Sequence, residues 1–367
     1  MVEKRFARGV SHGFIFIMIG IFGGILGGIS GSLFIALLNY AQNLRELNHN
    51  WIFILPLVGI LLSFLRGAPK LILGSFLTHL GGGSAGREGA VIQLSRILAE
   101  KISSFFHFQE RKARRLVIIS MGAGFGAALG APWAGVIFGI EFNKSKFIRP
   151  WTLLHSLIAM LIAQAIIRIT HLPHFHLPAF VIPEYKITTL TILIITGILF
   201  GFSTAFFHFL RHQYEFAFKK CSPLITGLIG GVFLVILYYF FDLREYQGLG
   251  REVITQASQE ILPLVVTAKK IILTVITLGS GFQGGEFFPL AFIGSTLGSA
   301  FSFIDPNMTE LMVALGFVST YGSSTQTPIA CTLLAGELFG WKILPFAAIT
   351  VWIASRIHSR VSITSKE

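Results

Sequence analysis

Residues 81–93 read Gly-Gly-Gly-Ser-Ala-Gly-Arg-Glu-Gly-Ala-Val-Ile-Gln, and this stretch decides how the chain folds. It places Arg87 beside Glu88 between two segments that lack Asp, Glu, Lys and Arg, residues 71–86 and 116–140. A charged residue costs roughly 2.5 to 3.5 kcal/mol at the centre of a bilayer, so it is rare there unless it lines a polar cavity or has a function. The glycines leave backbone N–H groups unpaired, and unpaired N–H groups at the start of a helix attract anions. The stretch therefore predicts half of an anion site within a membrane.

The composition is that of a membrane protein. Of 367 residues, 53% are hydrophobic and only 13% are charged, whereas about 25% are charged in an average soluble domain. A helix needs roughly 20 apolar residues to cross a bilayer, and several uncharged windows approach or exceed that length. These windows are residues 13–44, 52–65, 116–140, 151–167, 224–241 and 271–285. The chain is therefore predicted to be an all-α integral membrane protein that crosses a cell membrane (inner or plasma membrane) several times.

The net charge of +12 comes from short connections between these windows. Lys and Arg gather at residues 4–8, 111–115, 144–149, 219–220 and 356–360. Basic loops of this kind are typical of the cytoplasmic side of a membrane and of contact with lipid headgroups, so no nucleic-acid partner is expected. Cys221 and Cys331 are too few for a disulfide framework or a metal site, and no cofactor is expected.

The sequence contains an internal duplication. Residues 131–141 match residues 327–337, because each segment has Pro, then Ala two residues later, then Glu nine residues after the Pro. Upstream, Gly-Arg-Glu at residues 86–88 matches Gly-Gly-Glu at residues 284–286. The spacing between the two matching motifs is nearly the same in both halves, which unrelated segments rarely share.

A duplicated unit with glycine-interrupted segments is typical of transporters. We expect a first membrane repeat over residues 1–170, a connection over residues 171–187 and a second membrane repeat over residues 188–367. In such folds, broken helices from the two halves meet near the bilayer midplane, where irregular backbone is tolerated because it lines a cavity or is buried in protein. The residues leave open whether the repeats are inverted or parallel.

These motifs resemble those of the CLC family of chloride channels and anion/proton antiporters. Gly-Arg-Glu-Gly at residues 86–89 is similar to the second family motif, Gly-Glu-Phe-Phe-Pro at residues 285–289 to the third, and Gly-Leu-Gly at residues 248–250 to a further signature. Within the family, residues 279–286 and 330–332 most resemble the prokaryotic fluoride-exporting branch. The resemblance implies two inverted structural repeats with broken helices that meet at the midplane, and a homodimer with one pore per subunit.

The resemblance also implies roles for individual residues. Glu88 would be the gating and proton-coupling glutamate, which occupies the anion pathway when ionised and swings out when protonated. Glu286 would be a second acidic residue at the central site, and the backbone N–H groups of Glu286 and Phe287 would help to hold the halide. The other anion-binding candidates are Gly86, Arg87, Gly89 and Gly285, and the candidate pore-lining residues are Phe288 and Trp341.

The sequence departs from the family pattern in three places. The first family motif is missing, and the turn at residues 65–70 stands where a helix and a filter loop would be. Phe288 occupies a position where the fluoride branch usually has a small hydroxyl residue. The pore tyrosine of many relatives has no clear match, and Trp341 is the nearest candidate.

Several of these residues also have a simpler interpretation. Glu88 would be a loop residue paired with Arg87 at a membrane surface, but the apolar flanks favour the gating role. Arg87 is either a structural partner for carbonyls or a nearby acid, or a group that draws anions in. Glu141 and Glu337 end apolar segments and are expected to be structural or to lie at the cytoplasmic mouth.

Enzyme and metal-site interpretations are less well supported. Residues 82–86 fit the Gly-x-Ser-x-Gly nucleophile pattern, but no buried strand precedes them and no convincing acid–histidine pair accompanies them. They are not a phosphate loop, because no Gly-Lys-Ser/Thr follows. His171, His174 and His176 lie in a Pro- and His-rich segment, which favours a solvated loop over a metal cluster. No enzymatic activity is expected.

The function expected from the sequence is transmembrane transport of fluoride or chloride by anion/proton antiport. Two alternatives stay open: a passive voltage- or pH-gated chloride channel, and a degenerate homologue that does not transport.

Overall fold

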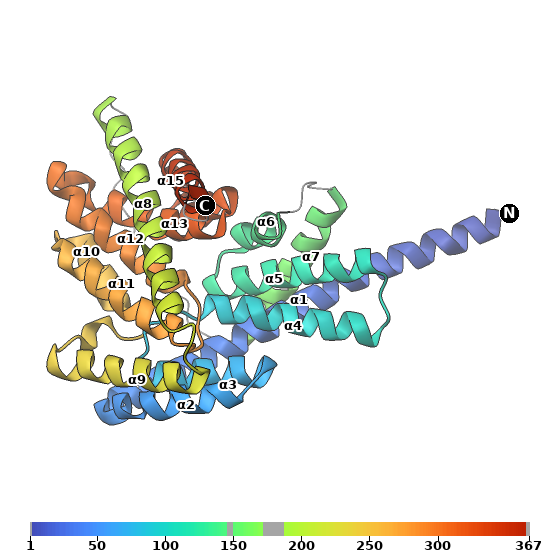
Figure 1. Ribbon diagram of the computed structural model, residues 1–367. Helices are drawn as coiled ribbons and strands as arrows, with labels where there is room; N and C mark the ends of the chain where they lie inside the picture. The colour runs from blue at the N-terminus through green and yellow to red at the C-terminus, as the bar shows by residue number, and fades with distance from the viewer. Residues whose placement is uncertain (1, 145–149, 172–186, 365–367) are drawn as a thin grey trace. The chain divides into compact units, whose positions relative to one another are not determined.

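The computed structural model describes residues 2–144, 150–171 and 187–364, which form helices joined by short loops (Figure 1). No β-strand is present within those ranges, as the predicted all-α class requires. The α-helices are α1 (Val2–Leu47), α2 (Leu55–Phe64), α3 (Gly67–Leu80), α4 (Glu88–Phe105), α5 (Glu110–Leu129), α6 (Pro132–Phe142), α7 (Pro150–Thr170), α8 (Ile187–Ala217), α9 (Pro223–Phe240), α10 (Arg251–Gln259), α11 (Leu264–Gly279), α12 (Phe287–Phe301), α13 (Thr309–Thr325), α14 (Pro328–Phe339) and α15 (Leu344–Thr364). The 3-10 helices are η1 (His49–Ile54), η2 (Arg244–Tyr246), η3 (Ser302–Ile304), η4 (Pro306–Met308) and η5 (Trp341–Ile343).

The chain divides into two compact units. Unit 1 comprises Met1–Ile35 and Val91–Phe175, and unit 2 comprises Ala36–Ala90 and His176–Glu367. These boundaries differ from the predicted repeats, because residues 36–90 of the predicted first repeat pack with the second half of the chain. The repeat boundaries stay a prediction, and most of the predicted connection lies outside the described residues. Both glutamate motifs fall in unit 2.

The repeated proline motif has the same local structure in both halves. In unit 1, α5 ends at Leu129, the next residue, Gly130, adopts the left-handed conformation (φ 71°), and Pro132 opens α6. In unit 2, α13 ends at Thr325, the next residue, Gln326, is also left-handed (φ 56°), and Pro328 opens α14. Proline suits the first turn of a helix because the N–H that it lacks would have no partner there. At this motif the duplication in sequence is therefore also a duplication in structure.

Five helices of the described part of the chain are long and apolar enough to cross a membrane. They cover Ile17–Leu47, Pro150–Thr170, Thr189–Ala217, Pro223–Phe240 and Phe287–Ile304. The third and fifth of these are not among the uncharged windows named from the sequence, although residues 187–210 and 287–304 contain no Asp, Glu, Lys or Arg. Conversely, the window at residues 271–285 is the end of α11 followed by a loop, and the window at residues 116–140 is broken at Gly130. The uncharged windows therefore identified apolar sequence, but their bounds did not match those of the continuous helices.

The turn predicted at residues 65–70 is shorter than expected. Leu65 and Arg66 are extended, and α3 already begins at Gly67. Pro69 falls within the first turn of α3, where its missing N–H is tolerated. The prediction of a turn over all six residues was therefore wrong, since a proline in that position is compatible with the start of a helix.

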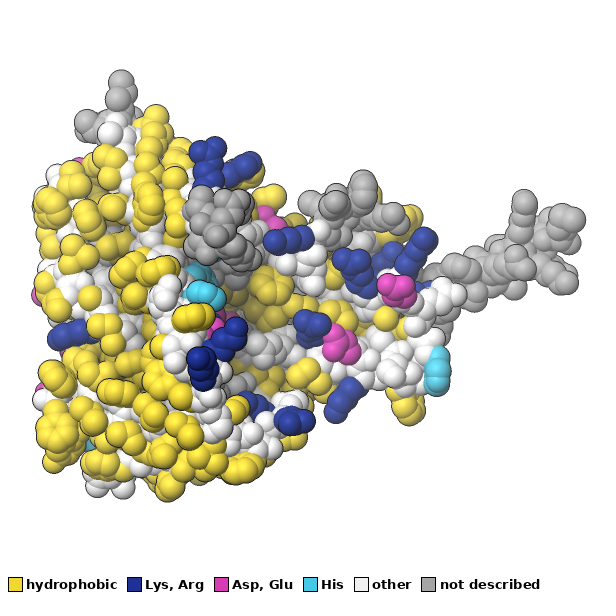
Figure 2. Space-filling model, viewed as in Figure 1, with side chains coloured by type: hydrophobic (Ala, Val, Ile, Leu, Met, Phe, Trp, Pro, Cys, Tyr) yellow, Lys and Arg dark blue, Asp and Glu magenta, His cyan; other side chains and the backbone are white. Residues whose placement is uncertain are grey.

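Close helix contacts in unit 2 depend on small residues. Gly294 of α12 faces Gly316 of α13, and a Cβ on either one would lie only 2.0 Å from the carbonyl oxygen of the other. Small residues of this kind let helix backbones approach closely in lipid, where packing rather than water exclusion drives association. The outer face of α9 is instead apolar and exposed, and Figure 2 shows hydrophobic side chains gathered over the same region. The exposed residues of α9 include Ile225, Val232, Phe233, Ile236, Tyr239 and Phe240.

Candidate anion site

The two glutamate motifs pair with each other through their backbones. The N–H of Gly86 donates to the carbonyl oxygen of Gly285 (2.7 Å), and the N–H of Gly285 donates to the carbonyl oxygen of Gly86 (2.6 Å). The pair forms an isolated antiparallel bridge. Helix α4 begins at Glu88 and helix α12 at Phe287, two residues beyond each end of the bridge. Two helix N-termini, one from each half of the sequence, therefore start at one point in unit 2.

The pairing requires glycine. A Cβ on Gly285 would lie 2.4 Å from the backbone nitrogen of Gly89, and a Cβ on Gly89 would lie 2.7 Å from the Cα of Gly285. Both separations are shorter than any ordinary carbon contact, and the opposing atoms are backbone, so neither side can yield without moving a helix start. Gly89 and Gly285 therefore allow the two motifs to touch, while a Cβ on Gly86 would meet its nearest neighbours at 3.1 to 3.2 Å.

Hydroxyl side chains hold the loops that lead into the bridge. The N–H of Ser84 donates to Oγ1 of Thr277 (3.1 Å), and Oγ of Ser84 lies 2.8 Å from Oγ1 of Thr274, both on α11. In return, the N–H of Gln283 donates to Oγ1 of Thr78 on α3 (3.2 Å). The loop that follows α3 is thus anchored by α11, and the loop that follows α11 is anchored by α3.

Arg87 and Glu88 form a buried ion pair at the start of α4. Nε of Arg87 lies 3.1 Å from Oε1 of Glu88, and the side chains are 1% and 0% exposed. The second carboxylate oxygen of Glu88 accepts a hydrogen bond from the backbone N–H of Arg87 (3.2 Å). The carboxylate therefore lies against a backbone donor at a helix N-terminus, where the dipole and the N–H groups favour a negative charge.

Glu286 has different surroundings, although its backbone adjoins the same bridge. Its side chain is 29% exposed and forms an ion pair with Arg211 of α8. Arg211 also pairs with Glu215 one turn further along that helix (2.8 Å). The structure thus brings the backbones of the two motifs together, while the buried Glu88 and the partly exposed Glu286 direct their carboxylates to different partners.

Phe287 and Phe288 are fully buried beside the bridge. The guanidinium carbons of Arg87 and Arg251 lie 6.0 Å and 5.6 Å from the ring centre of Phe288, within the range of cation–π attraction. Phe287 makes an edge-on contact with Tyr321 of α13, with ring centres 4.6 Å apart. The predicted pore-lining Phe288 therefore lies at the site, with a cation near its ring from each half of the sequence.

Tyr321 is a site residue that the sequence did not reveal. It is 4% exposed, and its hydroxyl lies within electrostatic range of both Glu88 and Glu286. The only sequence signal is a single tyrosine in the apolar and small-residue run of α13. Trp341, the predicted counterpart of the family's pore tyrosine, is instead 52% exposed in η5, with its ring against Gly336. This placement gives no support to a pore-lining role for Trp341.

Two further basic side chains, Lys270 of α11 and Arg251 of α10, lie around the loop before α10. Lys270 is fully buried, and its Nζ donates to the carbonyl oxygens of Tyr246 and Gly248, both at 2.8 Å. Arg251 opens α10 outside the membrane-spanning helices; burial, followed by the positive charge of Arg87, lowers the pKa of its guanidinium to about 10, and the charge of Glu88 opposes this shift. Arg251 is therefore still protonated at neutral pH, and it carries positive charge toward the Arg87–Glu88 pair.

Metal and disulfide chemistry gain no support from the described residues. No group of three His, Cys, Asp or Glu side chains that could hold a metal is found among them. His174 and His176 of the histidine-rich segment lie outside the described residues. Cys331 is buried in α14 and Cys221 is exposed. Glu141 and Glu337 lie near the ends of α6 and α14.

Known proteins resemble this chain over most of its length. Residues 65–359 match the family model described as voltage gated chloride channel. The chain is 28% identical over 366 residues to the chloride/fluoride channel protein of Pseudomonas syringae pv. tomato, an alignment that covers 89% of this chain and 80% of the relative. It is 27% identical over 282 residues to the H(+)/Cl(-) exchange transporter ClcA of Vibrio cholerae, covering 71% of this chain and 59% of that protein.

Solved structures share the fold. The crystal structure of a CLC-type fluoride/proton antiporter superposes with a TM-score of 0.85 at 28% identity, over 96% of both chains. A slow cyanobacterial Cl-/H+ antiporter superposes with a TM-score of 0.78 at 22% identity, again over 96% of both chains. The family model covers most of the sequence, and the paired motifs are those on which the family resemblance was based. This protein therefore belongs to the voltage gated chloride channel family, the CLC family.

Proposed function

We propose that the protein exchanges a halide for a proton across the membrane, with fluoride as the preferred anion. One observation carries the proposal: the carboxylate of Glu88 lies at a helix N-terminus formed where the two motifs pair, against a backbone N–H that an anion would use. A carboxylate and a halide need the same donors, so they compete for one place. Protonation of Glu88 removes its charge and releases the donors to the halide. Anion entry and proton uptake are then linked.

Arg87 keeps the ionised form of Glu88 in place. Its guanidinium neutralises the carboxylate in a site that excludes water, where an unpaired charge would be strongly unfavourable. When Glu88 takes up a proton, the cation remains and offers its charge to the incoming anion. This role combines the structural and the anion-attracting interpretations of Arg87.

Glu286 is proposed as the second proton-handling residue. Its carboxylate is partly exposed while its backbone adjoins the bridge, so it can exchange protons with water next to the site. Tyr321 packs edge-on against Phe287, the residue after Glu286, and interacts electrostatically with both carboxylates. The halide itself would be held by the backbone N–H groups near Gly86, Gly285, Glu286 and Phe287.

The proposed preference for fluoride rests on two relatives whose names include fluoride. A chloride/fluoride channel protein and a CLC-type fluoride/proton antiporter each share 28% identity with this chain. A passive channel is the second candidate, because one of these relatives is named a channel. The same resemblance supports a homodimer in a cell membrane, with two inverted repeats in each subunit.

Flux through proteoliposomes tests the proposal. Vesicles that hold sodium fluoride or sodium chloride at the same concentration inside and outside are given an inward proton gradient, and anion efflux is followed with an ion-selective electrode while internal pH is followed with a dye. Antiport predicts uphill anion movement driven by the gradient, with fluoride moving faster than chloride. In Glu88→Gln the coupling is lost, because the side chain can no longer change charge.

The other outcomes identify the alternatives. Anion leak without proton coupling in the native protein indicates a passive channel. No flux of either ion above empty vesicles indicates a homologue that does not transport. Unchanged coupling in Glu88→Gln removes Glu88 as the gate.

A further inference from the structure

Two histidines of unit 2 face each other where α8, α13 and α15 pack together. His208 belongs to α8 and His358 to α15, and their ring centres are 5.3 Å apart with the rings tilted by 36°. His208 is half-buried, and His358 is only 8% exposed. We call these two residues the histidine pair. Neither belongs to the glycine bridge or to the Arg87–Glu88 ion pair.

His208 lies within a helix that is long and apolar enough to cross a membrane. That span is Thr189–Ala217, and it has no ionisable side chain before position 208. Ionisable residues within such helices are costly, and they are kept where they face the protein interior and have a function. The ordinary pKa of histidine lies near neutral pH, so the side chain can accept and release a proton there. The histidine pair is therefore a candidate for proton transfer.

Arg211 links the histidine pair to the carboxylate of Glu286. Residues three apart on a helix lie on the same face, so His208 and Arg211 are neighbours on α8. Arg211 forms an ion pair with Glu286, and His208 interacts electrostatically with both of these residues and with Glu215. A proton that leaves Glu286 therefore has a titratable acceptor one helical turn from the arginine that holds the carboxylate. The charge of Arg211 compensates the carboxylate that remains.

Hydrogen bonds to α13 orient both rings of the histidine pair. Nε2 of His208 lies 2.8 Å from Oγ of Ser324, and Nδ1 of His358 lies 2.8 Å from the carbonyl oxygen of Ser323. A carbonyl oxygen only accepts, so Nδ1 of a neutral His358 carries the ring proton and Nε2 is the acceptor. Oγ of Ser323 also donates to Oγ1 of Thr204 on α8 (2.9 Å). Two adjacent residues of α13 thus hold the rings that face each other.

The far side of the histidine pair lies close to the membrane surface. Arg356 and Arg360 are placed on either side of His358 along α15, and both are exposed. Exposed arginines are strongly disfavoured in the bilayer core, so this part of α15 lies where water or lipid headgroups begin. Proton transfer needs groups within hydrogen-bond reach or joined by one water, and the separation of the two rings satisfies this requirement. The pair therefore spans the distance between Glu286 and the surface.

We propose that His208 and His358 carry protons between Glu286 and water. The proton leaves the carboxyl oxygen of Glu286 and binds a ring nitrogen of His208. His208 then gives a proton to Nε2 of His358, which releases it to water. Both rings end neutral, as they began, and Glu286 is left as a carboxylate paired with Arg211; uptake follows the reverse order. The proposal rests on the proposed antiport function and names the residues that deliver its proton.

The test compares variants of the histidine pair with matched variants outside it. His208→Gln and His358→Gln keep a polar side chain that makes hydrogen bonds but cannot carry the proton. His212→Gln is the first control, because His212 is an exposed histidine one turn further along α8.

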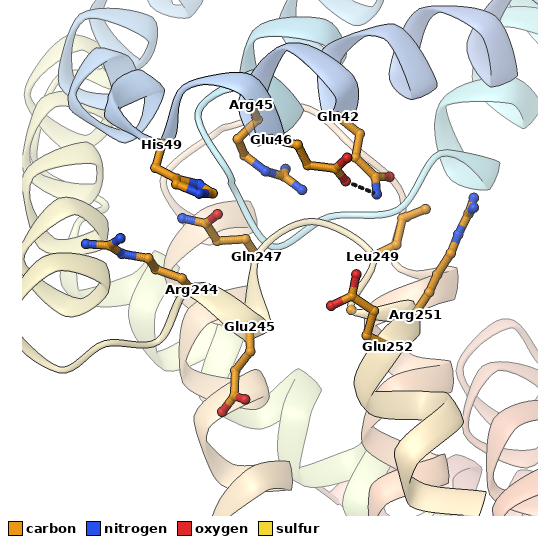
Figure 3. A pocket seen from close by; sticks show the side chains of 11 residues that line it. Gln42, Arg45, Glu46, His49, Arg244, Glu245, Gln247, Leu249, Arg251 and Glu252 are labelled. Carbon is orange, nitrogen blue, oxygen red and sulfur yellow. Dashed lines mark hydrogen bonds between the residues drawn. The ribbon is translucent and has the colours of Figure 1, made fainter.

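A second control comes from a polar cavity of about 320 Å³ at the end of α1, which no residue of α8, α13 or α15 lines (Figure 3). Glu245 of that cavity is exposed, and Figure 3 shows its carboxylate pointing away from the other lining side chains. Glu245→Gln therefore removes a titratable surface group that is not part of the proposed route. Proton-coupled anion turnover of all variants is measured in proteoliposomes, in light and in heavy water, across a range of anion concentrations.

The proton route predicts slower turnover with a larger solvent isotope effect. In His208→Gln and His358→Gln, coupled turnover falls by roughly tenfold or more, since a positioned proton-transfer group contributes at least that much. The half-saturating anion concentration is unchanged, and the isotope effect rises because proton delivery becomes the slow step. The double variant is no slower than the slower single variant, because both residues act in one route. His212→Gln and Glu245→Gln stay within about twofold of the native protein.

Two results would overturn the proposal. Turnover in both histidine-pair variants that matches the controls would show that protons bypass the pair. A lower turnover with an unchanged isotope effect would indicate a merely structural role for these side chains.

Failure of the antiport function is distinguishable from failure of the proton route. If the native protein shows no proton-coupled flux, the antiport proposal fails, and the route is then judged by NMR titration of histidine-labelled protein in detergent. A titration midpoint of His208 that differs between the native protein and Glu286→Gln supports the link between these two groups, and identical midpoints overturn it. Thermal unfolding of each variant shows whether it is folded, and His358→Gln decides the matter if His208→Gln is not.

Discussion

Gly86 and Gly285, about two hundred residues apart in the chain, exchange two backbone hydrogen bonds of 2.7 and 2.6 Å. This bridge is the point at which the two halves of the sequence meet, and it sets the start of α4 and of α12 side by side. Because main-chain groups make the bridge, any residue could form its hydrogen bonds. At position 285 only glycine fits, since a Cβ there would lie 2.4 Å from the backbone nitrogen of Gly89.

Gly89→Ala is expected to lower stability and transport. The new methyl group would lie 2.7 Å from the Cα of Gly285, which separates the two motifs. Overpacking of this kind destabilises a protein by roughly 1 to 3 kcal/mol. Gly31→Ala is the matched control, because its nearest neighbour would be the methyl group of Ala127 at 3.1 Å, a looser contact than the one at Gly89. Thermal unfolding in detergent measures both variants, and equal midpoints would show that close contact at the bridge is unimportant.

Arg87→Gln is expected to be strongly destabilising, and a second substitution should relieve the effect. Removal of one partner from a buried ion pair leaves the other charge uncompensated and costs about 3 to 5 kcal/mol. Arg87→Gln therefore lowers the unfolding midpoint more than Glu88→Gln combined with Arg87→Gln does. The double variant has no buried charge at this pair and regains stability. Additive effects of the two substitutions would contradict a direct ion pair between these side chains.

Glu286→Gln is expected to reduce proton coupling while anion flux continues. The substitution removes a titratable group beside the site but leaves the backbone N–H groups that we propose bind the anion. Glu215→Gln is its control, because Glu215 pairs with the same arginine, Arg211, without adjoining the bridge. The proton:anion ratio is measured in proteoliposomes. A ratio that falls equally in both variants would assign the effect to Arg211 rather than to Glu286.

The contribution of Arg251 to anion uptake is expected to be independent of pH near neutrality. Its pKa is lowered to about 10 by burial and by the charge of Arg87. A guanidinium is positive below its pKa, so the charge is present throughout the neutral range and is lost only as pH rises through about 10. The ratio of native to Arg251→Gln uptake is therefore constant within about twofold between pH 6 and 8.5. A ratio that collapses below pH 8 would show that another group titrates in this pathway.

Several features were predictable from sequence because they follow from local physical chemistry. An arginine–glutamate pair in apolar sequence indicates a buried functional site, and glycines before a helix indicate free backbone donors. The helix starts at Pro132 and Pro328 can each be predicted from the residues next to them. Both prolines follow a break after the preceding helix. The family resemblance was confirmed by the match over residues 65–359.

Other features depend on segments that are distant in sequence. Tyr321 reaches the site only because α13 packs on α12, and Arg251 reaches it only because the loop before α10 is held by Lys270. The sequence grouped Glu88 with Glu286, but it could not show that one is buried with Arg87 and the other is partly exposed with Arg211. Trp341 was a candidate by residue type alone, and its exposure in η5 comes from the position of that turn.

The sequence alone determined that this is a helical membrane protein with two related halves and a glycine-rich motif before a helix in each, because composition and local spacing determine where helices start and which segments avoid water. Folding decided which donors and charges share a cavity. That decision depends on helix packing over long sequence separations, where a single glycine contact or a single buried cation determines which side chains meet.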